Sequence, residues 1–224
     1  MRALVCETLG PVTSHRVQEI PDPVPGKRQV AIRVHACGVN FADTLIVQGK
    51  YQERPELPFV PGSEVAGEVI ALGEGVKGIA LGQRVMALTS VGGFAEIALA
   101  SADTLIPLPD GIDFADAAAF TVAYGTSHVA LETRAQLKAG ETLIINGASG
   151  GVGLTALEIG KMMGATVIGL ASTEKSARWL LNAARIMSST WLTRNCVTRS
   201  RRWAGPTSAT TWSAARPSTP CSAV

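Results

Sequence analysis

The sequence predicts an α/β protein built from two parts, followed by a third stretch of different composition. Residues 1–120 contain many short apolar runs separated by turns, a pattern typical of a compact β-barrel-like domain. Residues 121–177 instead show a helix, a buried strand, a glycine cluster, a second helix and a second strand. That order predicts a βαβ unit with parallel strands. We therefore expect a β-rich domain over 1–120 and the start of an α/β domain over 121–177, with 178–224 outside both.

The first part is predicted to form strands because its apolar residues alternate with polar ones and turn residues interrupt them. Val30-Ala-Ile-Arg-Val-His-Ala36 alternates and is followed by Gly38, and Pro21 stops the run before it. One short helix is expected over residues 40–48. The strands expected in this part cover residues 2–6, 17–20, 30–36, 64–72, 84–87 and 93–99.

The second part alternates between helical and buried-strand patterns. Residues 114–131 carry apolar and small side chains at helical spacing. Residues 142–145 form a short continuous apolar run, which is typical of a buried parallel strand. Residues 152–163 are again helical, and residues 164–170 form the next strand. The order strand, turn, helix, strand is that of a βαβ unit.

A cluster of glycines lies between the two expected parallel strands: Gly147, Gly150, Gly151 and Gly153, with Val152 among them. This spacing permits a tight turn, close approach of the backbone to a pyrophosphate, and close packing of the helix on the sheet. The helix that follows offers unpaired N–H groups to the phosphates. An ordinary Gly-rich loop is the alternative, but the surrounding βαβ unit favours a dinucleotide site formed by these five residues.

The end of the second strand indicates which dinucleotide is bound. NAD sites place an acidic residue there to hold the ribose 2′-hydroxyl, whereas this chain has Ala171, Ser172 and Thr173, followed by Glu174 and Lys175. An uncharged strand end with a nearby lysine suits a 2′-phosphate, so we expect NADPH, with contacts from Ser172 and Lys175. Glu174 could serve NAD if the loop were shifted, and Lys175 could be an ordinary solvated lysine.

Composition excludes several classes of protein. No run of about eighteen apolar residues is present, so no membrane-spanning helix is expected. The start of the chain lacks the features of a secretory signal. The cysteines show no CxxC spacing, which argues against a disulfide framework and a structural zinc site. A cytoplasmic protein is therefore expected. The four cysteines are Cys6, Cys37, Cys196 and Cys221.

Several separated motifs occur in the order of one known family. Gly38-Val-Asn-Phe-Ala-Asp43, Pro61-Gly-Ser-Glu-Val-Ala-Gly67 and the glycine turn resemble the zeta-crystallin-like quinone oxidoreductase branch of the medium-chain dehydrogenase/reductase superfamily. The match covers residues 1 to about 177. It implies a GroES-like β-barrel domain followed by the first, truncated part of a Rossmann (doubly wound) dinucleotide-binding domain. Members of this family are commonly dimeric, and the resemblance leaves a homodimer open.

The same resemblance implies a site without metal. Zinc-dependent relatives have Cys where this chain has Asn40 and His where it has Ser63, and they carry a four-cysteine lobe near residues 88–94. Zinc needs three or four N, S or O ligands in a tetrahedral array, and Glu64 cannot bind it alone. Without a Lewis acid, a quinone or an α,β-unsaturated ketone is the expected substrate, because such acceptors delocalise the charge that arrives with a hydride.

By resemblance, three residues are expected at the reacting groups. Asn40 is expected near the nicotinamide, Tyr51 near the substrate as a hydrogen-bond or proton donor, and Thr121 against the cofactor. Each has a structural alternative: Asn40 as a helix cap, Tyr51 as a turn residue before Pro55, and Thr121 as a buried helix hydroxyl. Asp43 is interpreted as structural, since an acid in the first turn of a helix favours the helix dipole.

The last part of the chain departs from the family. From Arg178 onward there is no Asp, Glu or Lys, while this stretch holds seven arginines and all four tryptophans. GC-rich codons chosen for residues 178–188 and 205–222, read out of register, give sequences that resemble the family's continuation. Our hypothesis is a frameshift near 177–178 that leaves 178–224 as a non-homologous, poorly ordered tail. Nucleic-acid binding through its arginines is the weaker alternative.

The resemblance, together with the uncharged end of the second strand, therefore implies metal-free, NADPH-dependent reduction of a quinone or enone by hydride transfer. The alternative is a catalytically inactive fragment, or a binding protein, that retains partial affinity for the nucleotide. No metal, membrane or nucleic-acid partner is expected.

Overall fold

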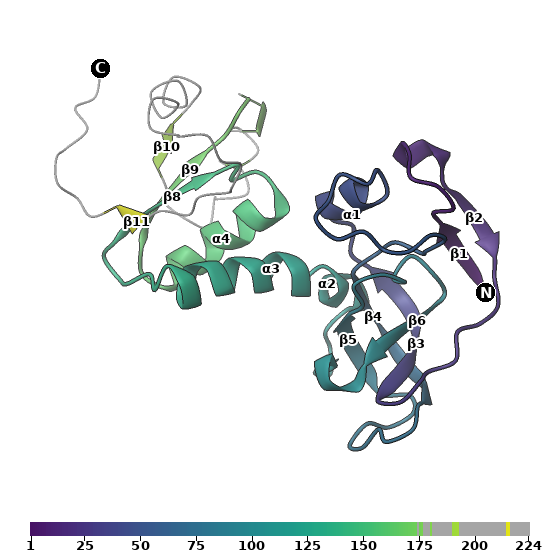
Figure 1. The fold of residues 1–224 in the computed structure, drawn as a ribbon. Coiled ribbons are helices and arrows are strands. Elements are labelled where there is room, and N and C mark those ends of the chain that lie inside the picture. Colours follow the sequence, from purple (N-terminus) through teal and green to yellow (C-terminus); the bar gives the residue numbers. More distant parts are fainter. Residues whose placement is uncertain (174, 177–179, 181–189, 193–213, 216–224) are drawn as a thin grey trace. The chain divides into compact units, whose positions relative to one another are not determined.

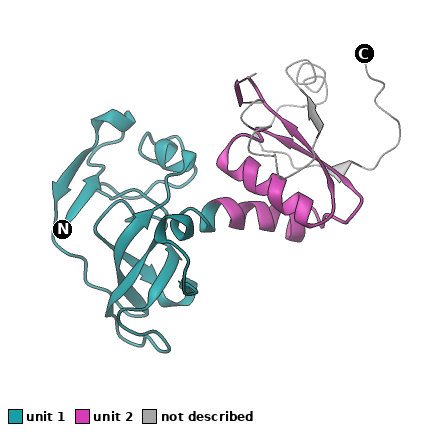
Figure 2. Ribbon diagram, turned by 180° about the vertical axis from the view of Figure 1, so that it is seen from behind, with its two compact units in different colours: residues 1–122 teal, residues 123–224 magenta. Residues whose placement is uncertain are grey.

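The chain divides into two compact units, residues 1–122 and 123–224 (Figure 2). The computed structural model describes residues 1–173, 175, 176 and 180, and the backbone of 190–192 and 214–215. Glu174 and most of 178–224 lie outside these residues. The NAD alternative at Glu174 and the expectations for the tail therefore concern residues that the structure does not describe.

Unit 1 is built mainly from antiparallel strands (Figure 1). A two-stranded sheet pairs β1 with β2, and a five-stranded sheet has the order β6-β3-β4-β5-β7. Two short helices, α1 (Phe41–Ile46) and α2 (Phe114–Ala118), belong to the same unit, with 3-10 turns at Val12–Ser14 and Ala102–Thr104. The strands are β1 (Arg2–Val5), β2 (Arg16–Glu19), β3 (Gln29–Cys37), β4 (Glu64–Leu72), β5 (Arg84–Leu88), β6 (Ile97–Ser101) and β7 (Ile106–Pro107).

The five-stranded sheet buries one row of side chains from each of its long strands. Successive residues of a strand point to opposite faces, so every second residue of a strand can pack into the same cluster. Val30 and Ile32 of β3, Val65 and Val69 of β4, and Val85 of β5 are at most 1 % exposed and form one cluster. Burial of this apolar surface is the main stabilising contribution in unit 1.

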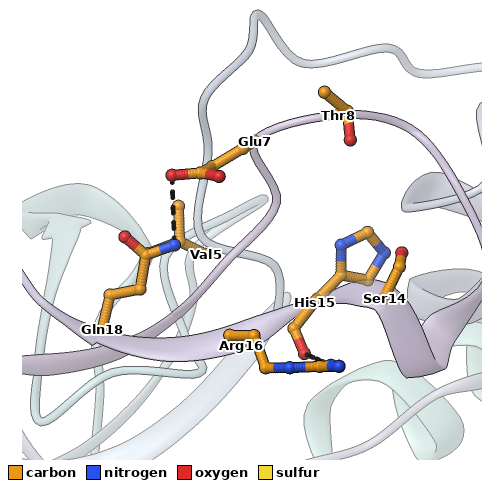
Figure 3. A pocket seen from close by; sticks show the side chains of 7 residues that line it. All are labelled: Val5, Glu7, Thr8, Ser14, His15, Arg16 and Gln18. Atoms are coloured by element: carbon orange, nitrogen blue, oxygen red, sulfur yellow. Dashed lines mark hydrogen bonds between the residues drawn. The ribbon is translucent and has the colours of Figure 1, made fainter.

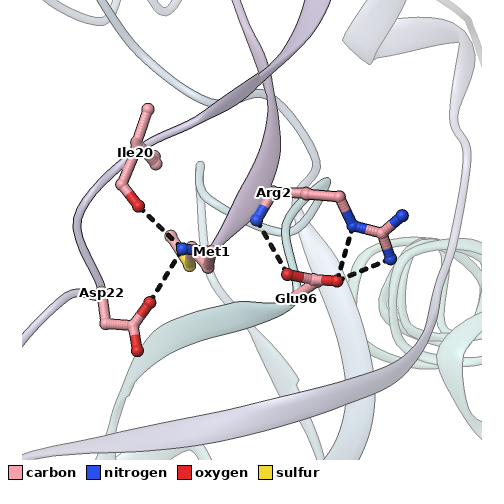
Figure 4. Close-up of polar contacts among 5 residues, drawn as sticks. All are labelled: Met1, Arg2, Ile20, Asp22 and Glu96. Carbon is pink, nitrogen blue, oxygen red and sulfur yellow. Dashed lines mark hydrogen bonds and ion pairs between the residues drawn. The ribbon is translucent and has the colours of Figure 1, made fainter.

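The N-terminal strand is attached to unit 1 by charged contacts at its start (Figure 4). The Met1 ammonium donates to the Ile20 carbonyl at 2.8 Å and to Asp22 Oδ1 at 3.0 Å. The Glu96 carboxylate accepts from the Arg2 backbone N–H at 2.8 Å and from its guanidinium at 2.8 and 2.7 Å. These bonds lower the pKa of Glu96. Exposed ion pairs add little stability, so the contacts mainly fix where β1 lies.

Unit 2 has the expected βαβ order. β8 and β9 pair in parallel, from Thr142 opposite Thr166 to Asn146 opposite Leu170, and α4 connects them. The division between the units falls within α3, which lies along α4 in unit 2 (Figure 1). The sheet order is β10-β9-β8-β11. The elements are α3 (Thr121–His128), a π-helical stretch (Val129–Arg134), β8 (Thr142–Asn146), α4 (Gly151–Met162), β9 (Thr166–Leu170), β10 (Thr190–Leu192) and β11 (Ala214–Ala215).

The core of unit 2 explains why the helix packs so near the sheet. Leu143 of β8, Val167 of β9 and Ala156 of α4 are each at most 1 % exposed. A Cβ added at Gly160 of α4 would lie 2.6 Å from Leu143 Cδ2 and 3.2 Å from Val167 Cγ2. The small residue therefore permits α4 to approach the strands closely, as a Rossmann-type unit requires.

The helix expected over residues 114–131 is broken in the structure. α2 ends at Ala118, and the Phe120 N–H donates to the Ala117 carbonyl, which closes a turn instead of continuing the helix. α3 then begins at Thr121, and the backbone N–H of its second residue, Val122, donates to the carboxylate of Glu64. A tertiary contact thus overrides the helical spacing seen in the sequence.

The strand expected over residues 93–99 begins later, at Ile97. The backbone N–H groups of Gly93 and Phe94 donate to the Gly62 and Pro61 carbonyls, so this segment packs on the loop before β4 instead of extending β6. In the part of the chain that the structure describes, none of the helices has the length and apolar character needed to cross a membrane.

Candidate functional site

Glu64, at the start of β4, is the centre of the polar cluster in unit 1. Its side chain is buried, with a relative exposure of 2 %. Oε1 accepts a hydrogen bond from Asn40 Nδ2 at 2.8 Å, and Oε2 accepts from Thr121 Oγ1 and from the Val122 backbone N–H, both at 2.7 Å. A buried carboxylate needs such donors to offset its lost hydration. Two of the residues expected at the cofactor, Asn40 and Thr121, are therefore brought together by a third residue.

Asn40 occupies the N-cap position of α1, so it also has the role of a helix cap, which was the structural alternative for this residue. Its backbone N–H donates to Asp43 Oδ2 at 2.7 Å, in the capping-box arrangement typical of a helix start. Asp43 is buried, and this burial raises the pKa of its carboxyl, while the bonds from Asn40 and Ser63 oppose the rise. The cap bond thus holds the backbone of Asn40, and the bond to Glu64 orients its side chain.

The residues before Asn40 are shaped by the same carboxylate. A Cβ added at Gly38 would lie 2.2 Å from Glu64 Oε1 and 2.6 Å from the Ala118 carbonyl, so only glycine fits there. Burial, with added repulsion from Asp43 and Glu64, raises the pKa of the neighbouring Cys37 thiol to about 12. Cys37 therefore stays protonated near neutral pH and is a poor nucleophile.

Tyr51 is not part of the Glu64 cluster. It is partly buried and packs against a second apolar cluster that contains Cys6, Ile46, Val47 and Phe59. Among the described residues its hydroxyl has no hydrogen-bond partner. Its ring is thus fixed by packing, and its hydroxyl is left for a ligand or solvent.

In unit 2 the glycine turn has the geometry that its spacing predicts. Gly147 has a φ of +70°, a conformation that favours glycine. The Gly150 N–H donates to the Gly147 carbonyl at 3.0 Å, and Gly150 is the N-cap of α4. A Cβ at Gly153 would lie 2.3 Å from the Gly147 carbonyl oxygen, so that position has no room for a side chain. Gly151, by contrast, faces open space.

Two buried hydroxyls lie behind this turn. Ser127 Oγ of α3 lies 2.7 Å from Thr155 Oγ1 of α4, and it also donates to the Val152 carbonyl at 2.8 Å. Thr155 Oγ1 lies 3.0 Å from both the Val152 and the Ala123 carbonyls. This cluster connects α3 to the first turn of α4, the turn whose N–H groups are expected to receive phosphates.

Ser172 and Lys175 follow the end of β9 and are both exposed. Because β8 and β9 are parallel and in register, the end of β9 lies at the same edge of the sheet as the start of the glycine turn. The Ala148 N–H of that turn donates to the Leu170 carbonyl at 3.1 Å. The edge is thus shared by Ser172 and the turn. Thr173 Oγ1 accepts from the Ser176 N–H at 3.1 Å.

Sequence reasoning does not find Glu64, Ser127 or Thr155. The sequence presents Glu64 only as a lone metal ligand, although the motif that contains it is recognisable. Ser127 and Thr155 give no signal beyond a small polar residue on an apolar helix face. Within the described ranges, no group of three or more His, Cys, Asp or Glu side chains is placed to hold a metal ion.

Two hollows in unit 1 contain none of the residues expected at the site. A small one of about 60 Å³ is lined by β1–β2 residues around His15, whose Nε2 is buried without a hydrogen-bond partner among the described residues (Figure 3). A shallow one of about 500 Å³ is lined by residues that include His35, Cys37 and Phe94. Neither is lined by Glu64 or by the residues that donate hydrogen bonds to its carboxylate.

The alcohol dehydrogenase GroES-like domain matches residues 26–110 of this chain. Quinone oxidoreductases from Mus musculus and Homo sapiens are each 42 % identical to it over 183 residues. The aligned part covers 81 % of this chain and 55 % and 56 % of those proteins. The chain thus spans about half the length of the curated relatives it matches.

Solved structures of quinone oxidoreductases are also similar to this chain. The Escherichia coli quinone oxidoreductase complexed with NADPH has a TM-score of 0.81 at 29 % identity, over 91 % of this chain and 62 % of that one. The Thermus thermophilus quinone oxidoreductase, also solved in complex with NADPH, has a TM-score of 0.74 at 32 % identity, over 91 % and 63 % of the two chains. Residues 26–110 thus match the alcohol dehydrogenase GroES-like domain, and the chain is similar to quinone oxidoreductases over about four fifths of its own length.

Proposed function

We propose that this chain carries the cofactor-binding and substrate-binding parts of an NADPH-dependent reductase of quinones or α,β-unsaturated ketones. The glycine turn between β8 and α4 is the observation that carries the proposal. Gly147 makes the turn at positive φ, Gly153 keeps the helix close to it, and Gly151 leaves space above the start of α4. The first N–H groups of a helix have no partners within it, so they are suited to hold a pyrophosphate.

The end of β9 supports NADPH over NADH. Ser172 stands where NAD sites place an acidic side chain, and both it and Lys175 are exposed at the edge of the sheet that carries the turn. A hydroxyl and an ammonium can both donate to a 2′-phosphate, whereas an acidic residue would repel it. Two structural relatives are solved in complex with NADPH, which supports the same choice.

The reaction proposed is transfer of a hydride to the quinone together with one proton, which gives the hydroquinone. The bound cofactor would supply the hydride. Tyr51 would donate the proton, since its ring is held by packing and its hydroxyl has no partner among the described residues. Asn40 and Thr121 would hold the nicotinamide end of the cofactor through the side-chain atoms that Glu64 leaves free. The residues at the zinc-ligand positions, Asn40 and Ser63, support a reaction without metal.

Parallel titrations with NADPH and NADH test the cofactor assignment. We expect NADPH to bind at least about tenfold more tightly, because one charge-assisted hydrogen bond contributes roughly 1.5–3 kcal/mol. Ser172→Asp should reverse the preference, and Ser176→Asp is the matched control that should not. Equal affinity of the wild-type chain for the two cofactors would reject the NADPH assignment.

A second candidate is a catalytically inactive fragment that keeps partial affinity for the nucleotide. The observation that favours it is the coverage of only 55 % of the Mus musculus relative. Cofactor binding without NADPH oxidation in the presence of a quinone would support the fragment. Oxidation that is reduced in Tyr51→Phe would support the reductase.

A further inference from the structure

The Glu64 carboxylate contacts the start of two helices through three hydrogen bonds. One oxygen accepts from Asn40 before α1, and the other accepts from Thr121 and Val122 at the start of α3. We propose that Glu64 is a positioning residue for cofactor binding, which fixes the Thr121 hydroxyl as a hydrogen-bond acceptor and selects a donor group on the ligand. This inference rests on the proposed function of Asn40 and Thr121.

The hydroxyl of Thr121 can donate only one hydrogen bond. A threonine hydroxyl has one proton and two lone pairs, and its proton is directed to Glu64 Oε2 at 2.7 Å. The same oxygen receives the Val122 backbone N–H, which can only donate, so Oε2 acts as an acceptor at this point. Thr121 is partly exposed and can reach a ligand. Its hydroxyl oxygen therefore offers a lone pair to the ligand, and the ligand groups that can donate to it are an amide N–H or a ribose hydroxyl.

Asn40 is oriented by the other carboxylate oxygen. Nδ2 donates to Glu64 Oε1 at 2.8 Å, and a flipped amide would place two oxygen acceptors against each other. The backbone of Asn40 is also held by the Asp43 cap. Both side chains proposed to face the cofactor are thus set by a group that lies beneath them and does not itself reach the ligand.

The surroundings of Glu64 leave it no alternative arrangement. The side chain is 2 % exposed, and Gly38 packs so closely on Oε1 that even a methyl group would lie 2.2 Å away. No Lys, Arg or His forms an ion pair with Glu64 among the described residues. The three hydrogen bonds from Asn40, Thr121 and Val122 are therefore those that stabilise the carboxylate. Loss of the carboxylate removes a hydrogen bond from each of these residues.

A double-mutant cycle on NADPH affinity tests this inference, with Glu64→Gln and Asn40→Ser as the two changes, since serine keeps a helix-capping residue. In the Glu64→Gln variant the new amide has to place its oxygen toward the Val122 N–H and the Thr121 hydroxyl, which donate to the same oxygen, and its NH₂ group then opposes Asn40 Nδ2. We expect each single change to raise the Kd for NADPH about tenfold. The double variant should bind no more than about twofold weaker than the weaker single variant, because Glu64→Gln acts through Asn40.

Matched controls separate this role from a merely structural one. Glu68→Gln, on the same strand and outside the cluster, should leave the Kd unchanged. Thr121→Ser keeps the hydroxyl and should restore binding that Thr121→Val loses. If Glu64→Gln does not fold, this Thr121 pair still decides, since equal Kd values for Ser and Val would overturn the proposal.

The possible failures are distinguishable. A wild-type chain that does not bind NADPH would reject the proposed function and this inference with it. A wild-type chain that binds NADPH, combined with additive effects of the two changes or no effect of Glu64→Gln, would reject the inference alone.

Discussion

Ser127 Oγ and Thr155 Oγ1 lie 2.7 Å apart in the interior of unit 2, where Ser127 is 0 % and Thr155 is 6 % exposed. Both hydroxyls also contact the Val152 carbonyl in the first turn of α4. Hydroxyls buried in this way must find partners, and here each supplies one for the other. The pair therefore connects the position of α3 to the position of the glycine turn.

Replacing Ser127 with alanine should weaken both the fold and the proposed cofactor site. Loss of one buried hydrogen bond costs about 1 kcal/mol of the free energy of unfolding, and a less fixed α4 start should raise the Kd for NADPH severalfold. Urea unfolding and a fluorescence titration measure the two quantities. Thr166→Val, at an exposed threonine of β9, is the control and should change neither. A Ser127→Ala variant with unaltered stability would show that the pair is not needed.

The glycine turn predicts opposite effects at two positions two residues apart. A Cβ at Gly153 would lie 2.3 Å from the Gly147 carbonyl oxygen, so Gly153→Ala should destabilise unit 2 by roughly 1–3 kcal/mol. At Gly151 nothing lies within 4 Å of an added Cβ. Alanine there should leave stability unchanged or raise it by up to about 1 kcal/mol, yet weaken NADPH binding, because the methyl group would meet the pyrophosphate.

The two variants together separate folding from binding. Thermal unfolding and NADPH titration of both proteins give four values to compare. Normal NADPH affinity in a stable Gly151→Ala protein would place the phosphates away from the start of α4 and contradict the proposed site.

The sequence predicts the elements that depend on local patterns, and it fails where a distant contact decides. Alternation locates β3, the Gly-rich turns locate β4, and the glycine cluster locates the turn before α4. The break between α2 and α3 could not be predicted, because Glu64, whose side chain receives the Val122 N–H, lies 58 residues earlier in the chain. For the same reason the sequence supplies Asn40 and Thr121 only through family resemblance and does not reveal the residue that joins them.

The thiol of Cys37 should be inert near neutral pH and should make stability depend on pH in alkaline solution. Burial raises its pKa from 9.0 to about 12 in the folded protein. Between these values the unfolded chain releases the thiol proton while the folded chain retains it, so the free energy of unfolding falls as pH rises through this window. Cys37→Ala should show a smaller decrease.

Two measurements check the Cys37 prediction. Urea unfolding at several pH values above 9.0 compares the slopes of the wild-type and Cys37→Ala proteins. Alkylation of the native protein near neutral pH, mapped by peptide mass spectrometry, reports the reactivity of this thiol separately from the other cysteines. Rapid native alkylation of Cys37, or identical slopes, would contradict the burial argument.

The amino-acid composition changes within a few residues after residue 177, and this change is what a shift of the reading frame would produce. Acidic residues and lysines stop at Arg178, and the similarity to the Mus musculus relative covers 183 residues, or 55 % of that protein. We propose that a base was gained or lost near this junction, which would account for both facts. We therefore expect resequencing to restore the frame, and the intact protein from its native source to exceed 23.3 kDa in mass. The frame-corrected protein should then oxidise NADPH with a quinone. An unbroken gene that encodes a protein of 23.3 kDa would instead make the stretch from Arg178 genuine and would favour the inactive fragment over the reductase.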